Sequence, residues 1–108
     1  MKKYRVVFVA EAEDDLFDLY HFVAFYDSSD KADALLQKLE TACASLATLP
    51  YRGHIPPELE RIGLLDYREI SYKPYRIIYQ VRGKHVYIHG VLDGRRNMQE
   101  LLQKRLLR

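Results

Sequence analysis

The order of apolar and polar residues changes period several times along the chain, and each change predicts a new element of secondary structure. Residues 4–10 alternate, with Tyr4, Val6 and Phe8 on one side, which is typical of a β-strand. From Glu11 the apolar residues recur at steps of four and three, the spacing of one buried helix face. That face consists of Ala12, Leu16, Leu19, Val23 and Tyr26. The pattern therefore predicts a strand followed by an amphipathic helix.

A second helix is expected after the polar segment 27–30, whose aspartates and serines suit a turn and a helix N-cap. Its apolar residues repeat the four-three spacing: Leu35, Leu39, Ala42, Leu46 and Leu49. Pro50 ends this helix, and the proline-rich segment 50–57 is expected to be a loop. The short link between the two helices predicts an antiparallel helical hairpin with one shared apolar seam.

The second half of the chain returns to strand-like alternation. Residues 66–72 and the segment that starts at Tyr75 predict two strands joined through Lys73 and Pro74, and a glycine turn at 82–84 leads to a third. In the Tyr75 strand the predicted faces are Tyr75, Ile77, Tyr79 and Val81 against Arg76, Ile78, Gln80 and Arg82. In the third strand they are Val86, Ile88, Gly90 and Leu92 against His85, Tyr87, His89 and Val91. Asn97 is placed to cap a last helix over 98–107.

These elements predict an α+β fold in a single domain of residues 1–108. An N-terminal strand and an α-helical hairpin precede a three-stranded antiparallel meander and a C-terminal helix. The N-terminal strand is expected to complete the sheet, and the hairpin to pack on one sheet face. The C-terminal helix either packs on the sheet or protrudes.

Charge is distributed unevenly between the two parts of the chain, although the formal net charge is only +2. Residues 1–60 contain 6 Lys/Arg and 11 Asp/Glu, whereas residues 61–108 contain 11 Lys/Arg and 4 Asp/Glu. A basic C-terminal part favours an anionic partner, either nucleic acid or an acidic protein segment.

Several classes of site and location are disfavoured by composition. Cys43 is the one cysteine and lies in an apolar helical register, so we expect a reduced, structural thiol in a cytoplasmic protein. Apolar runs are too short to cross a membrane, which needs about 18 residues. The acidic residues near the start of the first helix suit the helix dipole better than a metal site, so no metal or other cofactor is expected.

The most informative stretch is 75–97, YRIIYQVRGKHVYIHGVLDGRRN. Together with the order of elements, the pattern over 67–106 resembles the RelE/ParE superfamily of bacterial toxins, which are encoded with an antitoxin in type II toxin–antitoxin modules. The resemblance covers nearly the whole chain. It implies a toxin that is masked by a cognate antitoxin protein.

Two branches of the superfamily imply different targets. RelE-like members are ribosome-dependent endoribonucleases that cut mRNA, and ParE-like members poison DNA gyrase. The resemblance to RelE-like enzymes matches Arg76 to a phosphate-binding strand arginine and Arg96 to an arginine beyond the last strand, with Arg68 near a third basic position. The catalytic tyrosine of those enzymes falls at about Leu102, which cannot transfer a proton.

That departure, together with the ending VLDGRRN, favours a ParE-like toxin that binds and poisons gyrase and is not an enzyme. Arg68, Arg76, Arg95 and Arg96 are then the candidate residues for target or antitoxin binding. The alternative is a ribosome-dependent mRNA endoribonuclease, in which His89 could supply acid–base chemistry beside Arg68, Arg76 and Arg96. A non-toxic nucleic-acid-binding adaptor is a weaker alternative.

Ordinary structural roles also remain open for the arginines. Arg76 could pair with Glu69 across the predicted strand pair, and Arg95 and Arg96 could balance the acidic first helix. The hypothesis of one active surface requires Arg68, Arg76 and Arg96 to converge on an accessible patch.

Overall fold

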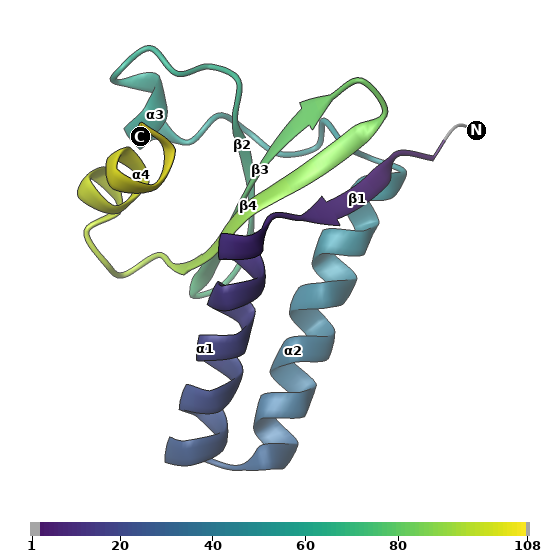
Figure 1. Cartoon of the computed structure of the whole chain (residues 1–108), viewed down its shortest axis with the longest axis vertical. Helices are drawn as coiled ribbons and strands as arrows, with labels where there is room; N and C mark the ends of the chain where they lie inside the picture. The colour runs from purple at the N-terminus through teal and green to yellow at the C-terminus, as the bar shows by residue number, and fades with distance from the viewer. Residues whose placement is uncertain (1–2, 108) are drawn as a thin grey trace.

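The computed structural model describes residues 3–107 and has the predicted α+β architecture. A four-stranded sheet carries a long helical hairpin, and shorter helices lie near the C-terminus (Figure 1). In chain order the elements are β1 (Arg5–Phe8), α1 (Ala10–Tyr26), α2 (Ser29–Ala44), the 3-10 turn η1 (Ser45–Ala47), α3 (Pro57–Glu60), β2 (Arg68–Tyr72), β3 (Tyr75–Arg82), β4 (His85–Asp93) and α4 (Met98–Leu106).

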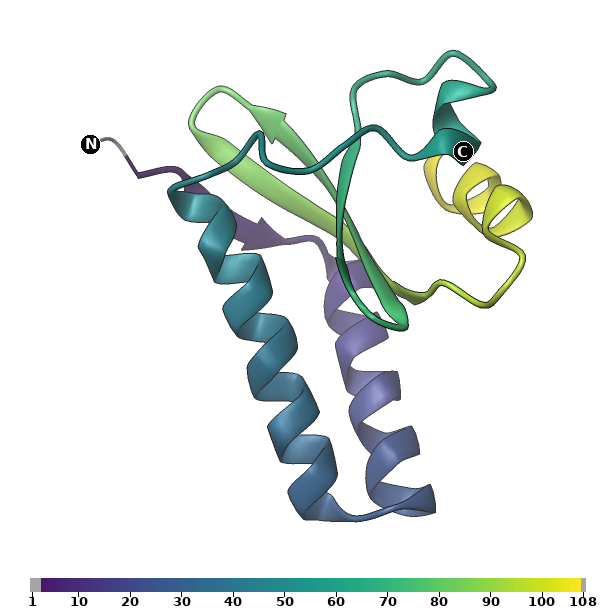
Figure 2. The ribbon, with the colours of Figure 1, turned by 180° about the vertical axis from the view of Figure 1, so that it is seen from behind.

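The sheet has the strand order β1-β4-β3-β2. β2, β3 and β4 form the predicted antiparallel meander, and β1 joins its edge in parallel with β4. Gly83 takes the positive φ of 59° that the turn between β3 and β4 needs, a conformation that favours glycine. The sheet thus brings the N-terminal strand beside the turn between the last two strands (Figure 2).

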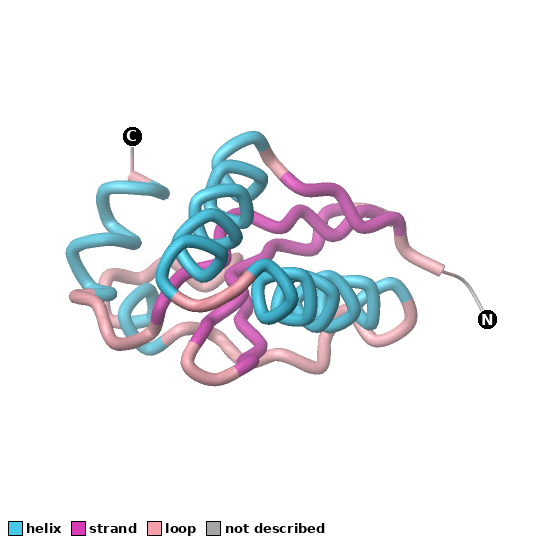
Figure 3. Tube along the Cα trace, turned by 90° about the horizontal axis from the view of Figure 1, so that it is seen from below, coloured by secondary structure: helices cyan, strands magenta, loops and turns pink. Residues whose placement is uncertain are grey.

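Two apolar cores lie on opposite faces of this sheet. The first core lies between the sheet and the hairpin α1–α2, and its buried residues include Ala12, Leu39, Cys43, Leu46, Ile70, Ile77, Tyr79, Val86, Ile88 and Val91. The second core joins the other face to α3 and α4, through Leu59, Ile78, Leu92, Met98 and Leu102. Of the two predicted positions for the C-terminal helix, the structure therefore shows the one in which it packs on the sheet. Figure 3 views the hairpin almost end-on and shows α4 set apart from it.

The helical hairpin extends beyond the sheet, and this explains one wrong prediction. Ser28 caps α2 as expected, because its Oγ accepts a hydrogen bond from the Lys31 backbone N–H at 3.1 Å. Tyr26, predicted as part of the buried face of α1, is 72% exposed at the hairpin tip, where no strand lies beneath it. Leu49 is also exposed, because regular α-helix ends at Ala44 and a 3-10 turn replaces its last turn.

A β-bulge in β4 overturns the predicted alternation of that strand. Tyr79 is paired with Ile88, but Ile78 is paired with Gly90, so His89 is an extra residue without an opposite partner. Beyond the bulge the faces are exchanged: Val91 packs in the first core and Leu92 in the second. The prediction that Leu92 shares a face with Ile88 is therefore wrong.

Candidate functional site

Arg76 is enclosed by two carboxylates. Its Nε and Nη2 donate to the Glu69 carboxylate at 2.5 and 3.0 Å, and its Nη1 and Nη2 donate to the Glu58 carboxylate at 2.8 and 2.7 Å. The Arg76 side chain is only 17% exposed. Its hydrogen bonds to Glu58, and then those to Glu69, raise the pKa of Arg76, while the same guanidinium lowers the pKa of Glu58.

The carboxylates around Arg76 come from two different parts of the fold. Glu69 lies on β2, and the predicted cross-strand pair with Arg76 is confirmed. Glu58 lies in α3, a short helix that begins at Pro57 and was not predicted. His54 Nε2 lies 2.8 Å from the second oxygen of Glu69. With two carboxylates against one guanidinium, the cluster offers no excess positive charge to a phosphate.

Arg68 lies at the start of β2, on the opposite side of the strand from Glu69. Its Nη1 donates to the carbonyl oxygens of Gly53 at 2.8 Å and Tyr51 at 3.4 Å, and its guanidinium lies 5.2 Å from the centroid of the Tyr51 ring. The loop that carries these carbonyls is packed closely. A Cβ on Gly53 would lie 2.5 Å from the Glu69 carbonyl oxygen, so only glycine fits there.

Arg95 and Arg96 follow β4 and are exposed, but they differ in their contacts. Arg95 Nη2 lies 2.6 Å from the Asp93 carboxylate, and hydrogen bonds from Arg95 lower the pKa of Asp93 to about 2. Within residues 3–107, the Arg96 side chain forms no hydrogen bond or ion pair. It lines a groove of about 340 Å³ together with Asp15 and Asp18 of α1. Arg96 is therefore an available cation at this end of the sheet.

His89 lies in the β4 bulge and is half-buried. Its Nε2 is 3.3 Å from the Gln80 side-chain oxygen, and its ring meets Tyr67 edge-on at 5.3 Å. Burial lowers the pKa of His89, which favours the neutral imidazole near pH 7. Leu102 is buried in the second core, so the residue that the resemblance matches to the tyrosine of RelE-like enzymes is part of the packing.

The structure does not bring Arg68, Arg76 and Arg96 into one groove. The groove beside Arg68 and the groove beside Arg96 share no lining residue, and Arg76 lines neither of them. Arg76 and Arg68 also project from opposite faces of the β2–β3 pair, since their register partners Ser71 and Tyr79 lie on opposite faces.

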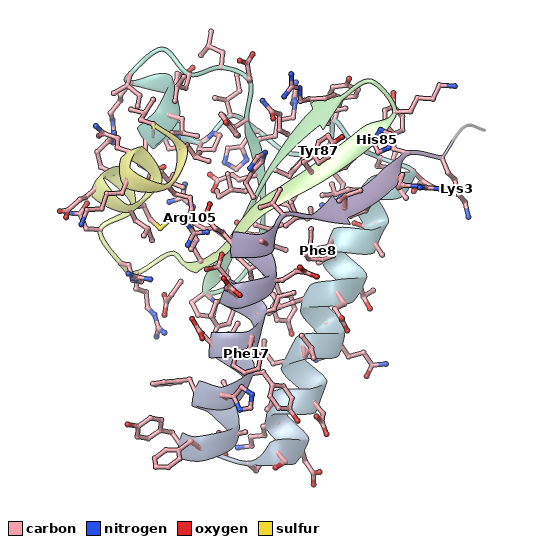
Figure 4. The ribbon with its side chains drawn as sticks, in the orientation of Figure 1. Lys3, Phe8, Phe17, His85, Tyr87 and Arg105 are labelled. Atoms are coloured by element: carbon pink, nitrogen blue, oxygen red, sulfur yellow. The ribbon has the colours of Figure 1, made fainter. Side chains whose placement is uncertain are left out.

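Arg105 was not singled out by the sequence, yet its side chain pairs with the first helix, 90 positions earlier in the chain. Its two terminal nitrogens each lie 3.0 Å from an oxygen of Asp15, which also accepts a hydrogen bond from the Val91 backbone N–H at 3.0 Å. Figure 4 shows Arg105 between α4 and α1. Hydrogen bonds to Asp15 raise the pKa of Arg105. The acidic first helix is thus balanced by Arg105, a pairing over 90 residues that no local pattern reveals.

Other candidate chemistry is disfavoured by the geometry. Cys43 is fully buried, and burial raises the pKa of its thiol to about 12. In the part of the chain that the structure describes, no cluster of three His, Cys, Asp or Glu side chains could bind a metal ion. Within residues 3–107, no helix is both long and apolar enough to cross a bilayer.

Comparison with known proteins identifies the family. The model of the ParE toxin of type II toxin–antitoxin systems, parDE, matches residues 6–98. This chain belongs to the ParE toxin family. A curated relative, Toxin ParE3 of Caulobacter vibrioides, is 31% identical over 101 residues, which are 94% of this chain and 97% of the relative.

Two solved structures share the fold of this ParE-family chain. A chain of the chromosomal ParDE system from P. aeruginosa has a TM-score of 0.70 at 18% identity, covering 82% of this chain and 94% of that one. A chain of the toxin–antitoxin complex RelBE2 from Mycobacterium tuberculosis has a TM-score of 0.60 at 24% identity, covering 86% and 93%. The predicted RelE/ParE resemblance is confirmed.

Proposed function

We propose that this ParE-family toxin inhibits bacterial growth in the cytoplasm by binding and poisoning DNA gyrase, and that a cognate antitoxin neutralises it. The observation that carries the proposal is the match of the ParE toxin model to residues 6–98, supported by 31% identity to Toxin ParE3 over nearly the whole chain. An antitoxin partner is supported because the structures that share the fold come from the ParDE system and from the RelBE2 complex.

The state of the candidate catalytic residues favours inhibition by binding over RNA cleavage. Cleavage needs a cation at the phosphate and groups that move protons. Arg76 is occupied by Glu58 and Glu69, and Leu102 carries no proton to transfer. His89 is half-buried against Tyr67. The groups that the resemblance offers for catalysis, at positions 76, 89 and 102, are thus not assembled for cleavage in the described structure.

One observation keeps the endoribonuclease as the second candidate. Arg96 is exposed and unpaired in the described structure, at the position that RelE-like enzymes fill with an arginine beyond the last strand. In the gyrase proposal the same residue contributes to the surface that meets gyrase or the antitoxin. Arg68 and Arg95 lie on accessible parts of the same molecule and are proposed for the same role.

Induction in bacteria separates the two candidates. We expect loss of colony formation together with double-strand DNA breaks on pulsed-field gels, while mRNA 5′ ends mapped by primer extension stay unchanged. Co-expression of the antitoxin encoded beside the gene restores growth. New mRNA ends with intact DNA would instead identify an endoribonuclease, and normal growth under strong induction would contradict both and favour the non-toxic adaptor.

Arg96→Glu tests the proposed surface in the same assay, with Lys38→Glu on the exposed side of α2 as its matched control. We expect Arg96→Glu to reduce killing at least tenfold and Lys38→Glu to leave it unchanged, at equal protein levels. Equal killing by both variants would exclude Arg96 from the target surface.

A further inference from the structure

A second set of cations gathers at the other end of the sheet, away from Arg96. Arg5 begins β1, while Arg82 ends β3 and Lys84 follows it in the turn. The Arg5 backbone N–H donates to the Lys84 carbonyl at 2.9 Å, so these segments lie side by side. All three side chains are exposed and, within residues 3–107, form no hydrogen bond or ion pair. Their positive charge is therefore available to a ligand.

The strand register aligns these cations with aromatic rings on one face of the sheet. Arg5 and Arg82 are both register partners of His85, so the three side chains form one cross-strand row. The next residue on the same face of β4 is Tyr87. The His85 and Tyr87 rings stack with an interplanar angle of 17° and a centroid distance of 5.7 Å. Figure 4 shows both rings at the end of the sheet where Lys3 also lies.

This part of the sheet face is not covered by helices. Val86 and Ile88, which alternate with the two rings, face the hairpin in the first core. α4 packs further along the strands, on Ile78 and Leu92. His85 and Tyr87 consequently remain partly exposed on the opposite face.

A polar groove of about 770 Å³ continues this surface on the other side of Arg82. Its lining includes Arg68, Gln80 and Arg82, and the Tyr51 ring that lies against the Arg68 guanidinium. Arg68 is held in place by the Gly53 carbonyl. Asp66 supplies the single carboxylate among the described residues that line the groove. The groove thus places Arg68 and the Tyr51 ring beside Gln80 and Arg82, although Arg68 projects from the other face of the β2–β3 pair.

We propose that this surface, formed by Arg5, Arg68, Gln80, Arg82, His85 and Tyr87, binds single-stranded nucleic acid. Cations that follow a groove and rings on which bases stack are the two features that proteins use for such ligands. Phosphates lie against Arg5 and Arg82, and a base stacks on the Tyr87 and His85 rings. An acidic peptide would use the cations, but only a nucleic acid presents a flat base at every position of its chain to the rings. The inference is independent of gyrase poisoning and needs no bond cleavage.

The test measures binding of a fluorescein-labelled twelve-nucleotide oligonucleotide, as DNA and as RNA, by fluorescence anisotropy at several salt concentrations. The full chain is made by cell-free synthesis to avoid toxicity. We expect binding at low salt that weakens as salt rises. Arg82→Gln weakens binding several-fold and makes the logarithmic salt slope shallower by about 0.7, the value for one lost phosphate contact. Tyr87→Leu weakens binding about tenfold and leaves the slope unchanged.

Two variants elsewhere on the surface serve as controls. Lys38→Gln removes an exposed cation on α2, and Tyr26→Leu removes an exposed ring at the hairpin tip. Both are expected to bind like the unchanged chain, and circular dichroism confirms that every variant is folded. The proposal is overturned by absence of binding at low salt, by equal losses in the control variants, or by a poly-glutamate peptide that competes as well as the unlabelled oligonucleotide. Because gyrase is absent, the result is independent of whether the toxin acts on gyrase.

Discussion

Arg76 is the residue whose loss the fold should tolerate least among the candidate arginines. Its guanidinium is the cation shared by Glu58 and Glu69, and removing one partner of a buried ion pair costs about 3–5 kcal/mol because the other charge is left unpaired. We expect Arg76→Met to lower the free energy of unfolding by about 3 kcal/mol in urea denaturation. Arg95→Met, which breaks an exposed pair with Asp93, should leave the free energy of unfolding nearly unchanged.

The same cluster predicts how stability depends on pH. Arg76 lowers the pKa of Glu58 below its ordinary value of 4.5, so this carboxylate stabilises the fold above that pH. The contribution is lost as the pH falls through the lowered pKa of the folded state. We expect the free energy of unfolding to fall on acidification below about pH 4.5 and this fall to be smaller in Arg76→Met, as measured by urea denaturation at successive pH values. An equal pH dependence in both proteins would contradict the pairing.

Cys43 should be chemically inert in the folded protein. Its thiol is fully buried, and its pKa of about 12 keeps it protonated at pH 8, whereas the thiolate is the reactive form. We expect no alkylation by iodoacetamide at pH 8 under native conditions and complete alkylation in 6 M urea. Mass spectrometry measures the alkylation under both conditions. Rapid labelling of the native protein would contradict the prediction and show that the first core opens readily around α2.

At the residue level, the sequence predicts contacts that are local and misses those that are not. The Arg76–Glu69 pair could be predicted from the sequence because a two-residue turn joins their strands. The contact between Glu58 and Arg76 could not be predicted, because Glu58 lies in a short helix that follows an irregular loop. The bulge at His89 was also hidden, since an inserted residue in a strand leaves the composition of the strand unchanged.

At the scale of elements, the Asp15–Arg105 pair holds α4 against α1. Asp15 accepts hydrogen bonds from Arg105 and from the Val91 backbone N–H, so replacing its charged oxygen affects both. We expect Asp15→Asn to lower the free energy of unfolding by about 2 kcal/mol and to speed hydrogen exchange most strongly in α4. Asp18 is exposed one turn later in α1, so Asp18→Asn should change neither the free energy of unfolding nor hydrogen exchange in α4. Unchanged exchange in α4 would contradict the role of Asp15.

The types and order of the long elements followed from periodicity, because each strand or helix buries one face. The ends of the buried faces could not be predicted from periodicity, because a face is buried only as far as the neighbouring element extends. Tyr26 continues the apolar spacing of α1 but lies beyond the sheet, and the exposed rings of Phe22 and Phe25 accompany it there. The helix α3 was missed because its four residues, Pro57–Glu60, are too short for any periodic pattern.

At the scale of the whole molecule, the two faces of the sheet are covered to different extents. One face is covered by the hairpin, and the other is divided between the second core and the exposed surface around Arg82. The sequence predicted that the C-terminal part of the chain is basic. It did not predict that the cations lie in separate groups at the two ends of the sheet. Arg96 lies at one end of the sheet, while Arg82 lies at the other with Arg5 of the N-terminal strand. Parallel pairing of β1 with β4 creates that second cluster from distant segments.

The most direct test of the central claim uses purified DNA gyrase, ATP and closed circular plasmid. We predict that the toxin causes linear plasmid to accumulate after detergent and protease treatment, in proportion to its concentration. We also predict that it leaves mRNA intact in a purified ribosome translation system. Cleaved mRNA on the ribosome with unchanged gyrase products would contradict the account.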